Sequence, residues 1–337
     1  MKGSAPLVRP VRPEDFDEIL ALAQRTGGGM TNLPPEPHAL RARIDKACAS
    51  FATDAREPGG EVYVLAMEIG GRVVGTSAVF SAIGLGSGFV NYKVVWTFHA
   101  SEQLDKRIRR RLLVPTHDFT GCAEVGSLFL AEEARGGGLG KFLARSRYLF
   151  IAQKPEIIAD PVCAELRGWR APDGSQPFWD ALGAKFFEME FEDADVHNAA
   201  NGNQIIADLM PRHPIYVCLL PDAARECIGK PHESAAPAYA MLKREGFSFD
   251  HYIDIFDGGP LVSAKQADIA TVRDSRLGTA VLADPAGGAE FLVAVGEGAG
   301  FRATRGLAVA GDDALIVGDA VASALGLEGG ETVRYVA

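Results

Sequence analysis

The spacing of apolar residues predicts strands and helices in mixed order over residues 1–193. Between residues 13 and 26, apolar side chains recur at the spacing that places them on one face of a helix. In chain order the prediction is a strand at 7–11, helices at 13–26 and 33–51, a hairpin at 61–83, strands at 88–100 and 122–133, a helix at 136–153, a strand at 161–169, and a helix followed by a strand at 176–191. This order favours an α+β (layered α/β) fold over the regular strand–helix alternation of a dinucleotide-binding domain.

The pattern changes twice further along, so the chain is predicted to have three parts. Residues 1–193 hold the elements above, and residues 194–276 add a second α/β segment that completes the functional site. Residues 277–337 show short strand patterns with glycine turns and one small helix, which indicates a small β-rich C-terminal region. The stretches 177–187 and 238–249 are both typical of a helix that ends at Gly before an aromatic residue, through either a partial duplication or two separate glycine caps.

Charge and cysteine content narrow the class of protein. The 337 residues carry a formal net charge of -10, and nucleic-acid binding depends on Lys and Arg neutralising phosphates. Nucleic acid is therefore not expected as a partner, and the basic run at 106–115 is interpreted as a solvated surface. The five cysteines are widely spaced with no C-x-x-C, which indicates reduced thiols in a cytoplasmic protein rather than disulfides or zinc. No signal-peptide pattern or membrane-length apolar run is seen, so no membrane partner is expected.

The stretch EEARGGGLGKFLARSR, residues 132–147, places four glycines directly before a predicted helix. Glycine loses much backbone entropy on folding. The stretch is therefore either a flexible turn or a loop that lets an anion approach the N-terminus of the helix. A Walker phosphate loop is excluded because Phe142 follows Lys141 where Ser or Thr would stand. The glycine spacing also excludes the G-x-G-x-x-G dinucleotide fingerprint.

A strand, this loop and a helix in succession resemble the signature of the GCN5-related N-acetyltransferase superfamily, [R/Q]-x-x-G-x-[G/A]. Arg135, Gly138 and Gly140 fill its defining positions. The resemblance implies an acyl-CoA N-acyltransferase fold whose preceding strand splays from its neighbour, and places the superfamily's helix–Gly–Phe element at 177–187. Bare N–H groups at the helix N-terminus favour an anion. The implied pyrophosphate-binding residues are Arg135, Gly136, Gly137, Gly138, Leu139 and Gly140.

Longer stretches resemble the arginine N-succinyltransferase family over residues 7–276. They are RTGGGMTNLP (25–34), HDFTGCAEVGSLFL (117–130), PFWDALGAKFF (177–187), ADLMPRHPIYVCLLP (207–221), HESAAPA (232–238) and GFSFDHYIDIFDGGP (246–260). The resemblance implies transfer of succinyl from succinyl-CoA, as a co-substrate, to the α-amino group of L-arginine, with no tightly bound cofactor and no metal. It also implies that His232, in an H-x-x-x-A-P segment, is the catalytic proton donor and that Leu128 contacts succinyl-CoA.

The chain departs from this family near the implied site. The family usually has Leu-Cys at Val125-Gly126, Asn at Leu139, and Pro and Thr at Glu233 and Ala235. Another donor or acceptor, such as acetyl-CoA or ornithine, therefore stays open, as does a non-catalytic subunit or acyl-CoA sensor. A homodimer and a heteromer with a paralogous subunit are both compatible with the sequence. A buried cation near the thioester would favour succinyl, whereas an apolar pocket would favour acetyl.

His232 and Glu124 are candidates on chemical grounds as well. His232 precedes Ser234, a good N-cap, and a helix N-terminus lowers the pKa of an imidazole toward the range that suits proton transfer. The alternative is a histidine that only caps or packs this helix. Glu124 is a candidate for binding the acceptor amine or guanidinium, and the alternative is a solvated strand end.

Two further pairs of residues are candidates for substrate binding. Arg212 and His213 are candidates for the succinyl carboxylate, because Arg binds a carboxylate through two hydrogen bonds. The alternative is a turn stiffened by the prolines around them. Gly28 and Thr31 lie between the first two predicted helices and are candidates for covering the acceptor, whereas a simple helix stop is the alternative.

Overall fold

A computed structural model describes residues 5–26, 30, 32–194, 197 and 204–337. Within these ranges, no helix has the length and apolar character needed to cross a membrane. Gly28 and Thr31, the candidates for covering the acceptor, lie outside the described residues.

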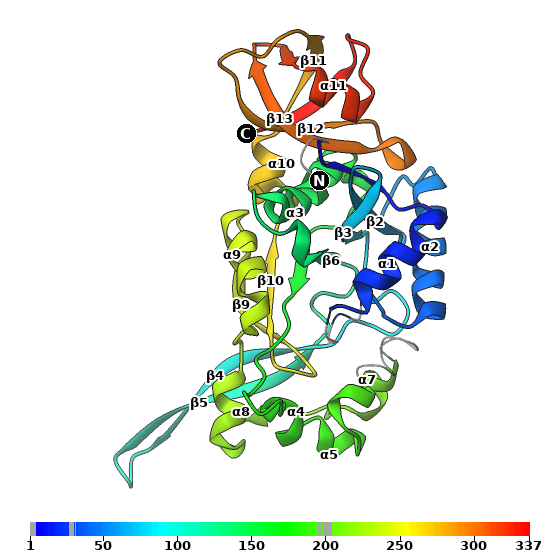
Figure 1. Ribbon diagram of the computed structural model, residues 1–337. Coiled ribbons are helices and arrows are strands. Elements are labelled where there is room, and N and C mark those ends of the chain that lie inside the picture. Colours follow the sequence, from blue (N-terminus) through cyan, green and yellow to red (C-terminus); the bar gives the residue numbers. More distant parts are fainter. Residues whose placement is uncertain (1–4, 27–29, 31, 195–196, 198–203) are drawn as a thin grey trace.

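Fifteen strands of the described chain form one continuous sheet along the length of the molecule (Figure 1). The strands are β1 (Leu7–Pro10), β2 (Val62–Ile69), β3 (Arg72–Phe80), β4 (Asn91–Ser101), β5 (Lys106–Thr116), β6 (Ala123–Leu130), β7 (Val162–Glu165), β8 (Ile215–Tyr216), β9 (Ser248–Asp254), β10 (Pro260–Ala264), β11 (Arg276–Leu282), β12 (Ala289–Val295), β13 (Arg302–Ala310), β14 (Ala314–Val317) and β15 (Thr332–Val336). Their order is β12-β15-β11-β14-β13-β1-β2-β3-β6-β7-β10-β9-β4-β5-β8. The β6–β7 and β11–β14 pairs are parallel, and the other pairs are antiparallel.

The parallel pair β6–β7 separates after two residue pairs. Ala123 and Glu124 lie opposite Val162 and Cys163. Beyond them β6 continues to Leu130, and no strand of the described chain pairs with this edge. An unpaired strand edge leaves backbone N–H and C=O groups available to another molecule. The splayed strand implied by the sequence resemblance is thus present in the structure.

Ten described helices flank the sheet or cap its ends. They are α1 (Phe16–Ala23), α2 (Pro37–Ala52), α3 (Leu139–Gln153), α4 (Pro177–Ala181), α5 (Ala184–Phe187), α7 (Gln204–Leu209), α8 (Asp222–Cys227), α9 (Ala236–Arg244), α10 (Ala270–Asp274) and α11 (Asp319–Leu325). Helix α2 packs on β2, and α1 and α3 pack on β3. Consecutive residues of β2 and β3 are buried, as expected for strands covered on both faces. The α+β expectation is confirmed.

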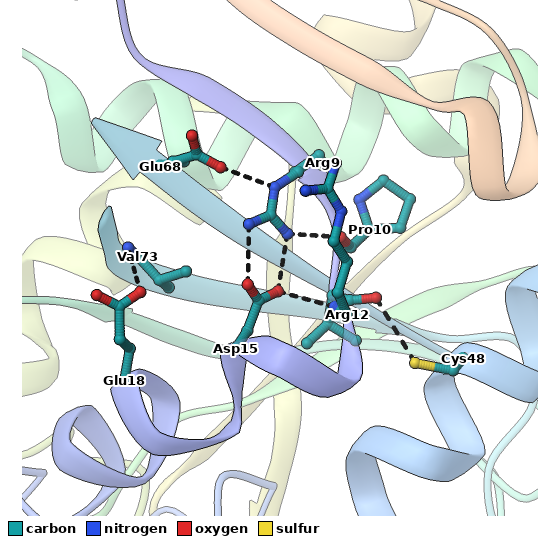
Figure 2. A network of polar contacts seen from close by, with 9 residues as sticks. Arg9, Pro10, Arg12, Asp15, Glu18, Cys48, Glu68 and Val73 are labelled. Atoms are coloured by element: carbon teal, nitrogen blue, oxygen red, sulfur yellow. Dashed lines mark hydrogen bonds and ion pairs between the residues drawn. The ribbon is translucent and has the colours of Figure 1, made fainter. Parts of the chain in front are cut away.

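A buried ionic network fixes the N-terminal strand to the start of α1 (Figure 2). Arg9 on β1 donates two hydrogen bonds to Asp15, at 2.7 and 2.9 Å, and one to Glu68 on β2 at 2.9 Å. Asp15 also accepts from the backbone N–H of Arg12 at 2.8 Å. Such a bidentate pair restrains geometry strongly. The network therefore sets the direction in which α1 leaves the sheet toward residues 25–34.

The strand predicted after the helix at 176–191 is wrong. Two short helices, α4 and α5, occupy this stretch, because Gly183 has a helical φ of -56° and does not end the helix in a left-handed turn. The lack of a side chain lets the Trp179 ring lie against Gly183, where an added Cβ would come within 2.2 Å of it. Trp179 and Phe187 then pack at a centroid separation of 5.2 Å in a second core that includes Tyr92 of β4.

The helix–Gly–Phe element beside the central sheet is instead at residues 236–254. Gly246 has φ of +101° and follows α9, and Phe247 then leads into β9. β10 pairs with both β7 and β9, so this element continues the sheet past the splayed strands. The placement of the element at 177–187 is therefore corrected, and the two similar stretches differ in structure.

The basic run at 106–115 forms β5. This strand was not predicted from the sequence, because its many charged residues hide the apolar–polar alternation of a strand. It pairs with β4 in a long hairpin that projects from the body (Figure 1). Most of its side chains are exposed or half-buried, as expected for a solvated surface. Arg109 stacks over the Trp96 ring at 3.7 Å, so the arginines cover aromatic residues of the partner strand.

The C-terminal strands β11–β15 enclose α11 in a core of their own. β13 also pairs with β1 through Leu7 and Val8, which joins this region to the central sheet. The sheet passes through all three predicted parts, 1–193, 194–276 and 277–337, and this division stays a prediction.

Candidate functional site

A cavity of about 1270 Å³ lies where β6 and β7 separate. Its walls include β6 from Glu124 onward, the end of β7, the first three turns of α3, and α9. A cavity of this size suits a ligand larger than a simple metabolite. Among the predicted site residues, those that line it are Glu124, Leu128, Arg135 and Gly140.

The glycine-rich loop presents bare backbone groups at the start of α3. Gly136, Gly137 and Gly138 have φ of +108°, +53° and +78°, conformations that residues with a side chain rarely adopt. Gly138 is the N-cap and makes no side-chain cap. The described residues offer no hydrogen-bond partner to the N–H groups of Gly140 and Lys141. The loop therefore has the geometry of an anion site at a helix N-terminus.

The middle of β6 is kinked beside the cavity. Ser127 has φ of +50°, and the register with β3 shifts between Thr76 and Ala78. The Oγ of Ser127 donates to the backbone oxygen of Asn32 at 2.9 Å, and Thr76 donates to the Ser127 carbonyl at 3.0 Å. A bulge of this kind re-aims backbone groups. It turns the strand at the position just before Leu128.

Glu124 is buried, not the solvated strand end of the alternative reading. It is 5% exposed and lines the cavity. Burial raises its pKa to about 7, although a 2.8 Å hydrogen bond from Asn32 Nδ2 and the charge of Arg43 both act to lower it. The described residues donate nothing to its second carboxylate oxygen, Oε2. A carboxyl group with a pKa near neutrality is suited to accept a proton.

Three more carboxyl groups lie beside Glu124 and form an acidic end of the cavity. They are Glu165, Asp254 and Asp257, all of which line it. Burial, together with the charges of Asp254, Glu124 and Asp257, holds the pKa of Glu165 well above its ordinary value. Burial and Asp257 do the same to the pKa of Asp254. A cation bound among these groups would be strongly favoured, because it would permit them to ionise.

A buried amide in the acidic end also lacks a partner. Asn91 is 0% exposed, and its Nδ2 donates to Oε1 of Glu165 at 3.0 Å. Its Oδ1 accepts no hydrogen bond from the described residues. An orphaned buried acceptor is unusual in a native protein. Asn91 does not line the cavity itself, so its part in the site is the hydrogen bond that it donates to Glu165.

His232 is positioned by the chain that follows β7. Its backbone N–H donates to the Arg167 carbonyl at 2.8 Å. The N–H of Ser234 donates to its Nδ1 at 3.1 Å, and Oγ of Ser234 lies 2.7 Å from the same atom. In the neutral ring the proton is therefore on Nε2. Partial burial, then the charges of Arg167 and Arg170, lower the pKa of His232, in the direction expected from the sequence. Arg167, Ser234 and Ala235 line the cavity beside it.

Arg212 and His213 are exposed and do not line the cavity. Residues Ile215 and Tyr216, just after them, pair with β5, which carries them toward the projecting hairpin. Their predicted contact with a succinyl carboxylate is therefore not supported by their position. These two residues were predicted to bind the carboxylate from their residue types alone, and residue type does not specify where in the fold the turn that carries them lies.

Sequence reasoning missed several groups of the site. Besides the acidic residues above, these are Arg147 on α3 and Arg305 on β13. Arg305 lies against the glycine-rich loop: a Cβ added at Gly138 would stand 2.9 Å from its Nη1. Strand signals identified the elements that carry these residues, but only the sheet order brings them together. Among the described residues no cluster of three or more His, Cys, Asp or Glu has the arrangement of a metal site.

We expect Gly138→Val to raise the KM for acyl-CoA about tenfold or more. A branched side chain is strained at φ of +78° and would stand where an anion must approach. Steady-state kinetics measures the effect. Gly71→Val is the matched control, because Gly71 has φ of +80° in the β2–β3 turn with open space around it. An equal KM in the two variants would remove the loop from coenzyme binding.

Comparison with known proteins agrees with this geometry. A family model described as "Arginine N-succinyltransferase beta subunit" matches residues 6–271, and one for its C-terminal domain matches residues 273–337. The chain is 37% identical over 331 residues to arginine N-succinyltransferase subunit beta of Pseudomonas aeruginosa, covering 98% of this chain and 97% of that one. It is 38% identical over 339 residues to arginine N-succinyltransferase of Yersinia pestis (strain Pestoides F), with the same coverage. A solved structure of arginine/ornithine succinyltransferase subunit AI from Pseudomonas aeruginosa superposes with a TM-score of 0.91 at 32% identity, covering 99% of each chain.

Proposed function

Because the chain belongs to the arginine N-succinyltransferase beta subunit family, we propose that it transfers succinyl from succinyl-CoA to the α-amino group of L-arginine. One observation carries the proposal. A single cavity runs from the glycine-rich loop, which suits phosphates, to a buried cluster of carboxyl groups, which suits a cation. Coenzyme and basic amino acid therefore have separate ends of one site.

The donor end is formed by the loop and β6. The N–H groups of Gly140 and Lys141 face the coenzyme pyrophosphate, and the pantetheine arm lies along the free edge of β6. The thioester then reaches the kink at Ser127 and Leu128, where a backbone N–H polarises its carbonyl. No step requires a tightly bound cofactor.

The acceptor end is formed by the acidic cluster. A guanidinium group has five N–H donors in a rigid fork, which suits Glu165 and Asp254 of the cavity wall together, and the hydrogen bond from Asn91 Nδ2 holds the Glu165 carboxyl in place. With the guanidinium held there, the α-amino group of arginine extends toward Glu124 and the thioester. Glu124 thus receives the amine that sequence reasoning assigned to it.

The reaction is a direct attack of the neutral amine on the thioester. A bond forms between the amine nitrogen and the acyl carbon, and the carbon–sulfur bond breaks. Glu124 accepts the proton that leaves the amine. The neutral ring of His232 donates a hydrogen bond through Nε2–H to the departing sulfur, since Nδ1 is held as an acceptor by Ser234, and so stabilises coenzyme A as it leaves in the thiolate form. Because one cavity holds both substrates in position, the entropy cost of bringing them together is met on binding, which lowers the barrier to reaction.

All these groups come from one chain, so we infer that the chain is active without a paralogous subunit. The test is to incubate the purified chain with succinyl-CoA and L-arginine and to identify the product by mass spectrometry. We expect arginine with one added succinyl group, located on the α-nitrogen by fragmentation. Absence of this product would overturn the proposal.

We expect Glu165→Gln to raise the KM for arginine about 10- to 100-fold, because a charge-assisted hydrogen bond of roughly 1.5–3 kcal/mol is lost. The KM for succinyl-CoA should not change. Calorimetry supplies a second measurement. Arginine binding lowers the pKa of the protonated carboxyls, so the wild type should release protons at pH 7 and the variant fewer. A KM for arginine that stays the same would place the guanidinium elsewhere.

A further inference from the structure

Arg147 is a buried cation that faces the cavity without an acidic partner. It is 3% exposed and lines the cavity from α3. Its Nε donates to the Ala144 carbonyl at 3.1 Å, and the described residues offer no hydrogen-bond or ion-pair partner to its two Nη groups. The carboxylate of Glu245 lies nearby but is bound by Arg145 at 3.3 Å and by Thr271 at 2.8 and 2.9 Å.

A buried guanidinium without a paired anion costs folding free energy, unless a bound ligand supplies the anion. A buried charge loses its hydration, and burial lowers the pKa of Arg147. Proteins normally compensate with a paired carboxylate and further hydrogen bonds. Two half-buried arginines of the cavity wall each lie near a carboxyl group that also lines the cavity: Arg43 near Glu124 and Arg167 near Asp257. Arg147 differs in that the carboxylate acting on it, Glu245, is already bound by Arg145 and Thr271, and no acceptor for either Nη group is found in the described part of the chain.

The position of Arg147 along α3 identifies the part of the ligand that it meets. Arg147 lies eight residues after Leu139, the first residue of α3, which is about 12 Å along a helix. Ser127, the residue at the kink, lies three residues before Leu130, the last residue of β6, which is about 10 Å along a strand. α3 follows β6 through the glycine-rich loop and packs back on it. Arg147 is therefore level with the β6 kink, where the thioester lies.

We propose that Arg147 binds the free carboxylate of the acyl group, and that it selects a dicarboxylic acyl donor over a neutral one. The inference rests on the proposed function, since it takes the acyl group to lie at the kink. A guanidinium binds a carboxylate through two parallel hydrogen bonds, and the two unpartnered Nη groups supply them. This is the buried cation near the thioester that a succinyl donor requires, whereas Arg212 and His213 are exposed and do not line the cavity.

The experiment compares succinyl-CoA with butyryl-CoA, which has the same four-carbon chain without the carboxylate. Arg147→Met keeps the apolar stem and removes the charge, a change that buried sites often tolerate. We expect kcat/KM for succinyl-CoA to fall about 100-fold or more, whereas butyryl-CoA is used equally well or better. The Kd for coenzyme A, which lacks the acyl group, should not change. Arg145→Met, on the same helix but already paired with Glu245, is the matched control and should keep the preference for succinyl.

The outcomes separate this inference from the proposed function. A wild type that uses succinyl-CoA no better than butyryl-CoA would overturn the proposed donor, and Arg147 with it. A wild type that prefers succinyl-CoA, together with an Arg147→Met variant that keeps the preference, would overturn only the assignment of Arg147. An equal fall for both donors, or a raised Kd for coenzyme A, would show that Arg147 serves the coenzyme or the fold instead.

Discussion

His232→Ala should lower kcat by roughly 10²–10⁴, the range for a positioned acid–base group. The Kd for acyl-CoA should be nearly unchanged, because His232 acts on charge that develops only as the thiolate leaves. The loss should shrink for a thioester whose leaving thiol has a lower pKa, since that thiolate needs less stabilisation. Stopped-flow measurement of thiol release with a series of thioesters checks both expectations.

A purely structural histidine predicts a different result. Because His232 caps the turn before α9 through Ser234, its removal would then lower thermal stability and reduce activity equally with every leaving group. Ser234→Ala is the matched control, since it removes Oγ and keeps the backbone N–H that holds Nδ1. We expect it to retain most of the activity. Full turnover by His232→Ala would remove the residue from the mechanism.

Glu124→Gln should lower kcat by roughly 100-fold or more, because glutamine cannot accept the amine proton. In the wild type, kcat/KM should rise with pH through about 7, the raised pKa of Glu124 in the free protein, because the ionised form is the base. The variant should lack this limb. A variant that keeps the limb would assign it to another group and remove Glu124 as the base.

Stability measurements separate this effect from misfolding. The folded-state pKa of Glu124, about 7, lies above the ordinary value of 4.5. The protonated carboxyl therefore favours the folded state at low pH, and this contribution is lost as the pH rises from about 4.5 through about 7. Because glutamine does not ionise, Glu124→Gln removes this pH-dependent loss of stability. The variant should be at least as stable as the wild type at pH 8 in urea unfolding.

The parts of the site that depend on local sequence were predictable, and the parts that depend on the sheet order were not. The glycine-rich loop, its helix and the histidine before α9 are each defined by adjacent residues. Glu165, Asp254 and Asn91 lie on three strands that meet only because β7, β10, β9 and β4 are neighbours in that order.

One expectation from the sequence was wrong and another is not supported by the position of its residues, and the two have a common cause. Gly183 suggested a helix stop, but the Trp179 ring packs against it and the chain continues as helix. Arg212 and His213 suggested an anion site, but the chain around them pairs with the projecting hairpin. In each case tertiary packing decided the outcome. Arg147 was missed for the same reason, because an arginine within a helical pattern is indistinguishable from a solvated one until the cavity beside it is known.

Thiol release by the purified chain alone, measured across acyl-CoA donors and amino-acid acceptors, tests the central claim most directly. The donors are succinyl-, butyryl- and acetyl-CoA, and the acceptors are arginine, ornithine and citrulline, a neutral isostere of arginine. A cavity with an acidic end for arginine and Arg147 beside the acyl group predicts the highest kcat/KM for succinyl-CoA with arginine. It also predicts a large fall in kcat/KM when either substrate is replaced by its neutral counterpart. Equal use of citrulline, a preference for acetyl-CoA, or no turnover by the chain alone would contradict the account.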